Sequence, residues 1–271
     1  VGNRAVVFAL ETLGFPVWAV PTVTLPWHPG HGPATRLVPD PRGFAAMLDD
    51  LARAPWLGEV GAILTGYFGD ATQIDAAAGL VRALKEKNPD TLYLCDPVMG
   101  DADGLYVPEP VAAGIRDRLM PLADIATPNR HELEWMAGRE LATINLLAAA
   151  ARQAGPHTML VTSAPAFLAG SIGNLLITPD TALMAEHRLI EPPASGTGDL
   201  VSAVFLARMM EGQPLAKALQ GASRSVFEIL ARTSRRGGDE LMLETDTSSL
   251  IHPMAMVQTR KLALPGDGRR A

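Results

Sequence analysis

Short apolar segments that are typical of buried strands alternate with longer amphipathic segments along most of the chain. Parallel neighbouring strands need a crossover between them, usually a helix, so this alternation favours parallel pairing. It predicts an α/β fold, a three-layer αβα sandwich around a doubly wound, mostly parallel sheet. Strands are expected at 17–20, 60–64, 91–95, 123–126 and 158–161, followed by a hairpin-like pair near 172–177 and 183–190. Helices are expected at 3–13, 40–51, 70–87, 108–119, 130–137, 143–154, 199–211, 214–233 and 238–250.

The composition fits one globular domain. With 271 residues, of which 48% are hydrophobic, the chain can bury a large core, so we expect a single domain over residues 1–263 and a flexible tail over 264–271. A net charge of −6 and an isoelectric point near 5.5 argue against nucleic acid or an anionic membrane as partner. No uncharged apolar run reaches membrane-spanning length, and the single cysteine, Cys95, fits a core position in a reducing cytoplasm.

Polar or backbone-exposing residues follow four of the expected strands. They lie at 66–67, 96–97, 127–129 and 162–163. In doubly wound folds, ligands bind beyond the carboxyl ends of the strands. We therefore expect these four segments to share one edge of the sheet and to form a single ligand site there.

The turn Gly196-Thr197-Gly198-Asp199 precedes an apolar helical run. Glycine lets the backbone approach a ligand closely, and the unpaired N–H groups at a helix start suit a phosphate. A carboxylate beside such a site repels the anion, so we interpret Asp199 as the base that takes a proton from a substrate hydroxyl as it attacks the phosphate. The alternative is a capped helix start, with Thr197 or Asp199 as the N-cap.

A second set of oxygen ligands follows two neighbouring strands. Asp96 comes directly after the strand at 91–95, and Glu132 lies in the first turn of the helix at 130–137, with Thr127 and Asn129 beside them. Carboxylates that act partly through water suit Mg²⁺. The alternative is that these residues only form turns and favour a helix start.

Other common signatures are absent from the sequence. There is no G-x-x-x-x-G-K-[ST] motif and no G-x-G-x-x-G motif after a strand, so an ATP site here would lack a P-loop lysine. The histidines show no metal-ligand spacing, and His28 and His31 in the long loop at 21–39 are the ones best placed for a functional role.

The order of the motifs resembles the pyridoxal kinases of the ribokinase-like superfamily over roughly residues 1–260. The motifs are Gly2-Asn3, His28…His31-Gly32, Thr65-Gly66-Tyr67-Phe68-Gly69, Cys95-Asp96-Pro97-Val98-Met99-Gly100-Asp101, Thr127-Pro128-Asn129…Glu132-Leu133-Glu134 and Gly196-Thr197-Gly198-Asp199-Leu200.

This resemblance implies ATP-dependent phosphorylation of the 5′-hydroxymethyl group of pyridoxal, giving pyridoxal 5′-phosphate, in a cytoplasmic homodimer. It implies that Asp199 is the base and that the amides from Gly196, Thr197 and Gly198 to Asp199 form the anion hole. It implies Mg²⁺ at Asp96 and Glu132, with K⁺ as a further candidate ion. The residues implied to lie around ATP are Asp96, Thr127, Glu132, Thr162 and Ser163, and those around pyridoxal are His28, Pro29, Gly30, Tyr67 and Asp199.

The sequence departs from the family pattern in three places. The family's first strand, with a serine that contacts the pyridine ring, is expected before Val1 and is absent. Pro29-Gly30 replaces the Thr-Gln of some members, and Thr162 replaces a lysine. Two alternatives follow: a hydroxymethylpyrimidine or sugar kinase of the same superfamily, or a non-catalytic protein that binds pyridoxal or a nucleotide.

Overall fold

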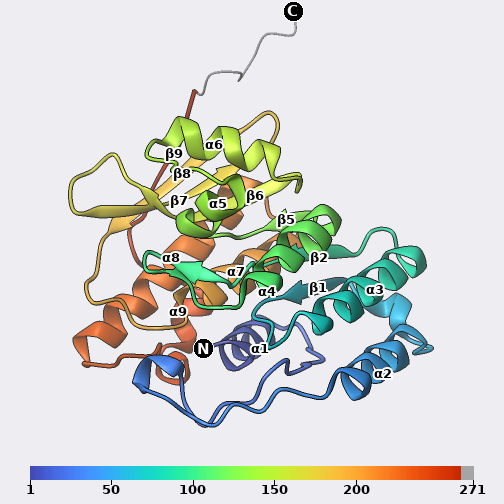
Figure 1. The fold of residues 1–271 in the computed structure, drawn as a ribbon. Coiled ribbons are helices and arrows are strands. Elements are labelled where there is room, and N and C mark those ends of the chain that lie inside the picture. The colour runs from blue at the N-terminus through green and yellow to red at the C-terminus, as the bar shows by residue number, and fades with distance from the viewer. Residues whose placement is uncertain (264–271) are drawn as a thin grey trace, which may run out of the picture.

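A seven-stranded sheet forms the centre of the computed structural model, which describes residues 1–263; the tail predicted at 264–271 lies outside them. The strand order is β1-β2-β5-β6-β7-β8-β9 (Figure 1). The first four strands in this order pair in parallel, and β7, β8 and β9 extend the sheet in antiparallel pairing. Their bounds are β1 (Ala62–Thr65), β2 (Leu92–Cys95), β5 (Ile125–Ala126), β6 (Thr158–Pro165), β7 (Ser171–Ile177), β8 (Ala182–Arg188) and β9 (Gln258–Lys261).

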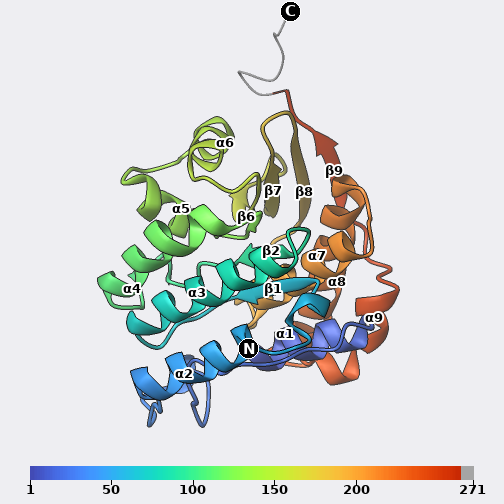
Figure 2. The same cartoon turned by 90° about the vertical axis from the view of Figure 1, so that its right-hand side faces the viewer.

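Helices cover both faces of this sheet (Figures 1 and 2). One face carries α2 (Pro41–Ala52), α3 (Thr72–Lys87), α4 (Glu109–Gly114), α5 (Arg130–Ala137) and α6 (Ile144–Gln153). The other face carries α1 (Asn3–Thr12), α7 (Thr197–Met210), α8 (Leu215–Arg235) and α9 (Thr247–Ile251). Alternate side chains of β2 point to the two faces, since Tyr93 and Cys95 join the first core and Leu94 joins the second. The predicted αβα sandwich is confirmed.

Shorter elements complete the described part of the chain. A π-helical turn (Ile115–Leu119) continues α4, and β3 (Gly100–Asp101) pairs with β4 (Gly104–Leu105) in a separate two-stranded ribbon. The 3₁₀ turns are Pro29–His31, Leu57–Glu59, Met120–Leu122 and Leu243–Thr245. Within residues 1–263, no helix is long and apolar enough to cross a membrane.

Two expectations about the elements are wrong, and one strand was not expected. Residues 17–20 are extended but form no strand in the described chain, because the edge strand β1 pairs only with β2; Trp18 is 52% exposed. Residues 238–250 contain only a 3₁₀ turn and the start of the short α9 rather than one helix. β9 escapes prediction because its sequence, Gln-Thr-Arg-Lys, carries no apolar signal; it is held by pairing with β8.

Helix α7 positions the turn at residues 196–199, for which the sequence predicts an anion site. Every residue from Leu200 to Ala207 is buried, so this helix is apolar all round. Such a helix belongs inside a protein rather than at its surface. It packs against α1 and α8, and Ser202 near its start donates to Asp96 directly after β2, so its N-terminus lies at the edge where the parallel strands end.

Candidate active site

The start of α7 forms a cradle of free backbone amides. Gly196 is the N-cap residue with φ of 99°, a left-handed conformation that glycine adopts without strain. In the described chain, none of the amides from Gly196 to Asp199 donates a hydrogen bond, and no side chain caps the helix. Four free donors at the positive end of a helix dipole form a site for an anion such as phosphate.

Asp199 does not cap its own helix. Its Oδ2 accepts a hydrogen bond of 2.7 Å from the amide of Gly2, the N-cap residue of α1, which is 197 positions away in the sequence. Desolvation raises the pKa of Asp199, while the Gly2 amide and then His28 act in the opposite direction. The alternative of a capping carboxylate is therefore wrong for this residue. A partly buried carboxylate with a raised pKa, beside an anion cradle, is suited to accept a proton.

Asp96, Thr127 and the helix α7 are joined by one buried hydroxyl. Ser202 donates to Oδ2 of Asp96 at 2.8 Å, and its oxygen lies 2.7 Å from the hydroxyl of Thr127. Burial, followed by the charge of Asp199, raises the pKa of Asp96 to about 7, and the bonds from Ser202 and Thr127 oppose that shift. The ends of β2 and β5 are thus tied directly to the first turns of α7.

Glu132 organises the loop that follows β2. Its Oε1 accepts from the amides of Met99 at 2.9 Å and Gly100 at 3.4 Å, and its Oε2 accepts from the amide of Asn129 at 2.8 Å. Asn129 in turn accepts from the amide of Glu132, which completes a capping box at the start of α5. Burial and then the charge of Asp96 raise the pKa of Glu132.

The donor set fits a divalent cation that is shared with a substrate. Asp96 and Glu132 are buried close enough together for the charge of Asp96 to raise the pKa of Glu132, and a cation near such groups relieves their repulsion. Among residues 1–263, no three His, Cys, Asp or Glu side chains converge to hold a metal alone. Mg²⁺ in proteins is commonly held by one or two carboxylates together with phosphate oxygens and water.

The raised pKa of Asp96 predicts how stability changes with pH. A folded-state pKa of about 7, above the ordinary 3.8, means that the contribution of this group is fully present at low pH and is lost as pH rises through 7. Asp96→Asn removes the buried charge, so in the absence of divalent cations we expect its free energy of unfolding to exceed that of the parent by about 2–4 kcal/mol at high pH.

Thermal unfolding at pH 5 and pH 8.5 measures this difference. Asp96→Asn should gain clearly more melting temperature relative to the parent at the higher pH, because at pH 5 only part of the loss between 3.8 and about 7 has occurred. Asp90→Asn, at an exposed position, should behave alike at both. An equal change for Asp96→Asn at the two pH values would contradict the assignment.

Thr162 and Ser163 lie within β6 rather than beyond its end. Thr162 forms a parallel bridge with Asn129 and donates its amide to the carbonyl of Pro128 at 2.9 Å. Ser163 has φ of 56°, and the register with β7 shifts between Val161 and Ala164. A non-glycine residue in this conformation is unusual and often marks a functional site. Both residues therefore sit next to the Asn129–Glu132 turn.

The residues predicted for the acceptor side come from two segments. His28 caps the 3₁₀ turn Pro29–His31, with its Nδ1 accepting from the amide of Gly30 at 3.2 Å, and it lies close enough to Asp199 to act on the pKa of that carboxyl. Tyr67 follows β1, and its hydroxyl accepts a bond of 2.7 Å from Arg36. His28 is thus near the proposed base, and Tyr67 is fixed where the edge strand ends.

Sequence reasoning missed two side chains of this site. Ser202 is the only hydroxyl inside the apolar run of α7, and that isolation was an available signal. Tyr106 follows β4, is half exposed and donates its amide to the carbonyl of Met99 at 3.1 Å, which places it beside the loop that Glu132 organises. Desolvation of its hydroxyl and then the charges of Glu132 and Asp96 raise its pKa. Nothing in its local sequence indicates that proximity, because the separate β3–β4 ribbon brings it there.

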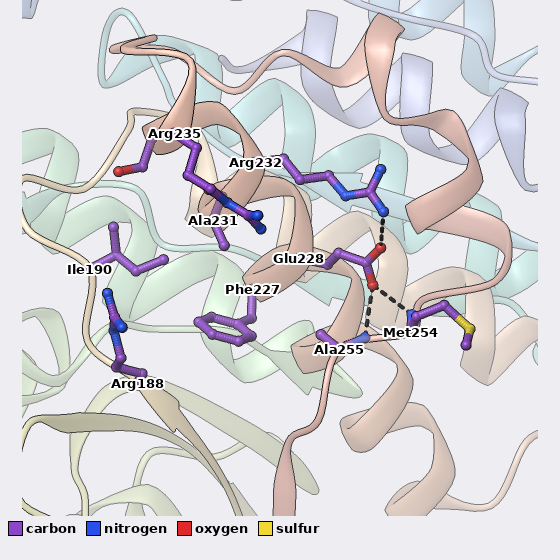
Figure 3. Close-up of a pocket in the computed structure, with 10 residues that line it drawn as sticks. Arg188, Ile190, Phe227, Glu228, Ala231, Arg232, Arg235, Met254 and Ala255 are labelled. Atoms are coloured by element: carbon purple, nitrogen blue, oxygen red, sulfur yellow. Dashed lines mark hydrogen bonds and ion pairs between the residues drawn. The ribbon is translucent and has the colours of Figure 1, made fainter.

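A pocket of about 550 Å³ lies between the end of β8, helix α8 and the segment before β9 (Figure 3). Ile190, Phe227 and Ala231 give it an apolar side, and Phe227 stacks on His187 with ring centroids 4.7 Å apart. Arg188 and Arg235 also line it, and neither pairs with a carboxylate in the described residues. Residues 189–195 lead directly from this pocket to Gly196.

Comparison with known proteins shows which family this chain resembles. A family model described as phosphomethylpyrimidine kinase matches residues 52–244. The pyridoxal kinase PdxY of Rubrobacter xylanophilus is 37% identical over 270 residues, which are 97% of this chain and 93% of that protein. The pyridoxal kinase PdxY of Deinococcus radiodurans is 35% identical over 90% of this chain and 86% of its own. The solved pyridoxal kinase of Leishmania donovani, in complex with ADP and pyridoxamine, has a TM-score of 0.90 at 27% identity, covering 97% of this chain and 95% of its own.

Proposed function

This chain belongs to the phosphomethylpyrimidine kinase family, in which the relatives it matches over nearly its whole length are pyridoxal kinases, and we propose that it transfers the γ-phosphoryl group of ATP to the 5′-hydroxymethyl group of pyridoxal. The product is pyridoxal 5′-phosphate. The proposal rests on one observation: four free backbone amides at residues 196–199 lie next to the carboxylate of Asp199. An anion cradle beside a proton acceptor is what phosphoryl transfer to an alcohol needs.

The chemistry follows from positioning and charge. Phosphoryl transfer requires little covalent work from the protein, so its catalysis rests on orientation and on neutralising the charge that spreads over the transferred group. The amides of residues 196–199 would donate to those oxygens, each contributing about 3–4 kcal/mol by analogy with oxyanion holes. Asp199 would take the proton of the 5′-hydroxyl group as the hydroxyl oxygen attacks the γ-phosphorus. The bond between that phosphorus and the β–γ bridging oxygen breaks, and ADP leaves.

Mg²⁺ is the metal that this donor set fits, and it would neutralise charge on the phosphates. Asp96 and Glu132 are the residues we propose to hold it. The oxygens of Glu132 already accept three amide hydrogen bonds, so its contact with the ion would run through water. Thr127 would keep Asp96 oriented through Ser202, and Thr162 and Ser163 would contact the nucleotide from β6.

We assign the nucleoside to the pocket of Figure 3. The pocket is lined by residues that lead into the cradle, Arg188 and Ile190, and by the end of α8. The loop after α8 is joined to the start of the cradle, because Ser195 donates its amide to the carbonyl of Asp239 at 2.7 Å. Its volume of about 550 Å³ lies within the range of small-molecule sites, and its apolar side suits a base. Pyridoxal would then bind on the other side of the cradle, near His28, Pro29, Gly30 and Tyr67.

Filling this pocket should weaken ATP binding selectively. Ala231→Phe adds a ring to the exposed side of α8 where it lines the pocket, and we expect the KM for ATP to rise about tenfold because a bound base would be displaced. Steady-state kinetics with each substrate varied in turn measures this. Ala231→Ser, which adds one atom, is the matched control. A rise in the KM for pyridoxal instead would place the nucleoside elsewhere.

A coupled ADP-release assay tests the proposed function. The panel is pyridoxal, pyridoxine, pyridoxamine and hydroxymethylpyrimidine, each with ATP and Mg²⁺. We expect release with pyridoxal above hydroxymethylpyrimidine. Release with hydroxymethylpyrimidine alone would identify the alternative kinase, and pyridoxal binding by calorimetry without ADP release would identify a non-catalytic protein.

The remaining parts of the proposal concern assembly and location. We propose a homodimer, as the resemblance to pyridoxal kinases implies, and analytical ultracentrifugation tests it. We propose a cytoplasmic location; the single cysteine, Cys95, is a buried free thiol, which fits a reducing compartment.

A further inference from the structure

His31 contacts three side chains around the acceptor side of the site. Its Nε2 lies 3.3 Å from Oε1 of Glu240, and its Nδ1 lies 3.5 Å from Oδ2 of Asp239. Its ring meets the ring of His28 edge to face, with centroids 6.1 Å apart. His31 is therefore a link between the turn that carries His28 and the loop after α8.

The loop after α8 adjoins the phosphate cradle. Ser195 forms a parallel bridge with Glu240, in which its amide donates to the carbonyl of Asp239 at 2.7 Å and its carbonyl accepts from Leu241 at 3.2 Å. Gly196, the N-cap of α7, comes next in the chain. The backbone of residues 239–241 thus stays with the cradle whatever residue stands at position 31.

The turn at 28–32 has no other polar tie to the rest of the protein. The bridge between Thr24 and Leu37 closes the base of this long loop, and Trp27 bonds to Gly32 within it. Among the hydrogen bonds and ion pairs of residues 1–263, only those of His31 join residues 28–32 to another segment. Without the contacts of His31, the turn would be free to move and would have to become ordered when the substrate binds. The conformational entropy lost in that step would reduce the affinity for the substrate.

We propose that His31 is a positioning residue, which holds the His28–Gly30 turn against the phosphate cradle through Asp239 and Glu240. The inference rests on the proposed function in that the turn is the one assigned to pyridoxal. His31 does not touch the reacting atoms; it acts through the His28–Gly30 turn, where its ring contacts the ring of His28. Because the loop is ordered before pyridoxal arrives, the contact acts on the binding of pyridoxal rather than on phosphoryl transfer.

Steady-state kinetics of His31→Ala tests the inference. We expect the KM for pyridoxal to rise about five- to tenfold, with kcat and the KM for ATP within about twofold of the parent. His31→Gln, whose amide can still donate to Glu240, should restore most of the affinity. His157→Ala, at an exposed position far along the chain, is the control and should leave all three constants unchanged.

A double-mutant cycle separates the contact from a general loss of structure. In a Glu240→Gln background, His31→Ala should raise the KM for pyridoxal by a clearly smaller factor than in the parent, because the partner is already weakened. Equal rises in both backgrounds, an unchanged KM in His31→Ala, or equal rises in both KM values would overturn the inference.

The dissociation constant of pyridoxal, measured by fluorescence titration without ATP, keeps this test independent of catalysis. If the parent protein released no ADP with pyridoxal, the proposed function would fail, yet a tighter dissociation constant for the parent than for His31→Ala would still support the positioning role.

Discussion

Replacing Asp199 with alanine should lower kcat at least about a hundredfold while the KM for ATP changes by no more than about twofold. The reason is that the carboxylate acts on the proton of the acceptor hydroxyl, which moves only as the reaction proceeds, and makes no favourable contact with the nucleotide anion. Desolvation raises the pKa of Asp199 and so brings this base closer to the operating pH, which improves its fit to the task.

Two companion variants sharpen this experiment. Asp199→Asn keeps the volume of the side chain and an oxygen that can accept from the Gly2 amide, so a comparable loss there assigns the effect to the missing base rather than to packing. Asp180→Ala, on an exposed turn, should retain parent activity. Near-normal turnover in Asp199→Ala, measured by ADP release with pyridoxal, would mean that another group accepts the proton.

Replacing Glu132 with alanine should lower the free energy of unfolding by about 3–5 kcal/mol, since each buried donor left without a partner costs about 1–3 kcal/mol and a cavity adds to the loss. The side chain is 3% exposed and accepts from three backbone amides, those of Met99, Gly100 and Asn129. Alanine would leave all three without an acceptor in a buried place. The loop that follows Asp96 would then lose its anchor on α5.

Urea unfolding at equilibrium measures this loss. Glu132→Gln keeps one carbonyl acceptor and should lose clearly less stability than Glu132→Ala, and Glu140→Ala, at an exposed position beyond the same helix, should lose little. A loss below about 1 kcal/mol for Glu132→Ala would show that water satisfies the three amides, and the anchoring role would be wrong.

The sequence predicts those site residues that directly follow the end of a strand. Asp96 and Thr127 follow β2 and β5 directly, and parallel pairing brings such positions to one edge without further information. The start of α7 could also be predicted, because Gly196 and Gly198 directly before a long apolar run indicate a tight turn into a buried helix.

Contacts between distant segments escaped prediction for a physical reason. Ser202 joins Asp96 across 106 positions of the chain, and His31 reaches Glu240 across 209, so no local pattern could signal either pair. Strand signals failed in opposite ways: residues 17–20 are apolar but have no partner strand in the described chain, whereas polar β9 is a strand because β8 offers it an edge. Pairing, rather than composition, decided both cases.

The central claim is that the amides of residues 196–199 and the carboxylate of Asp199 serve transfer of phosphate to one particular hydroxyl. The most direct test is to incubate the protein with ATP, Mg²⁺ and either pyridoxal or 5′-deoxypyridoxal, and to quantify ADP together with the phosphorylated product by ³¹P NMR. The account predicts ADP and pyridoxal 5′-phosphate in equal amounts from pyridoxal, and neither from the deoxy compound. ADP without a phosphate ester, or equal ADP release from both compounds, would contradict it.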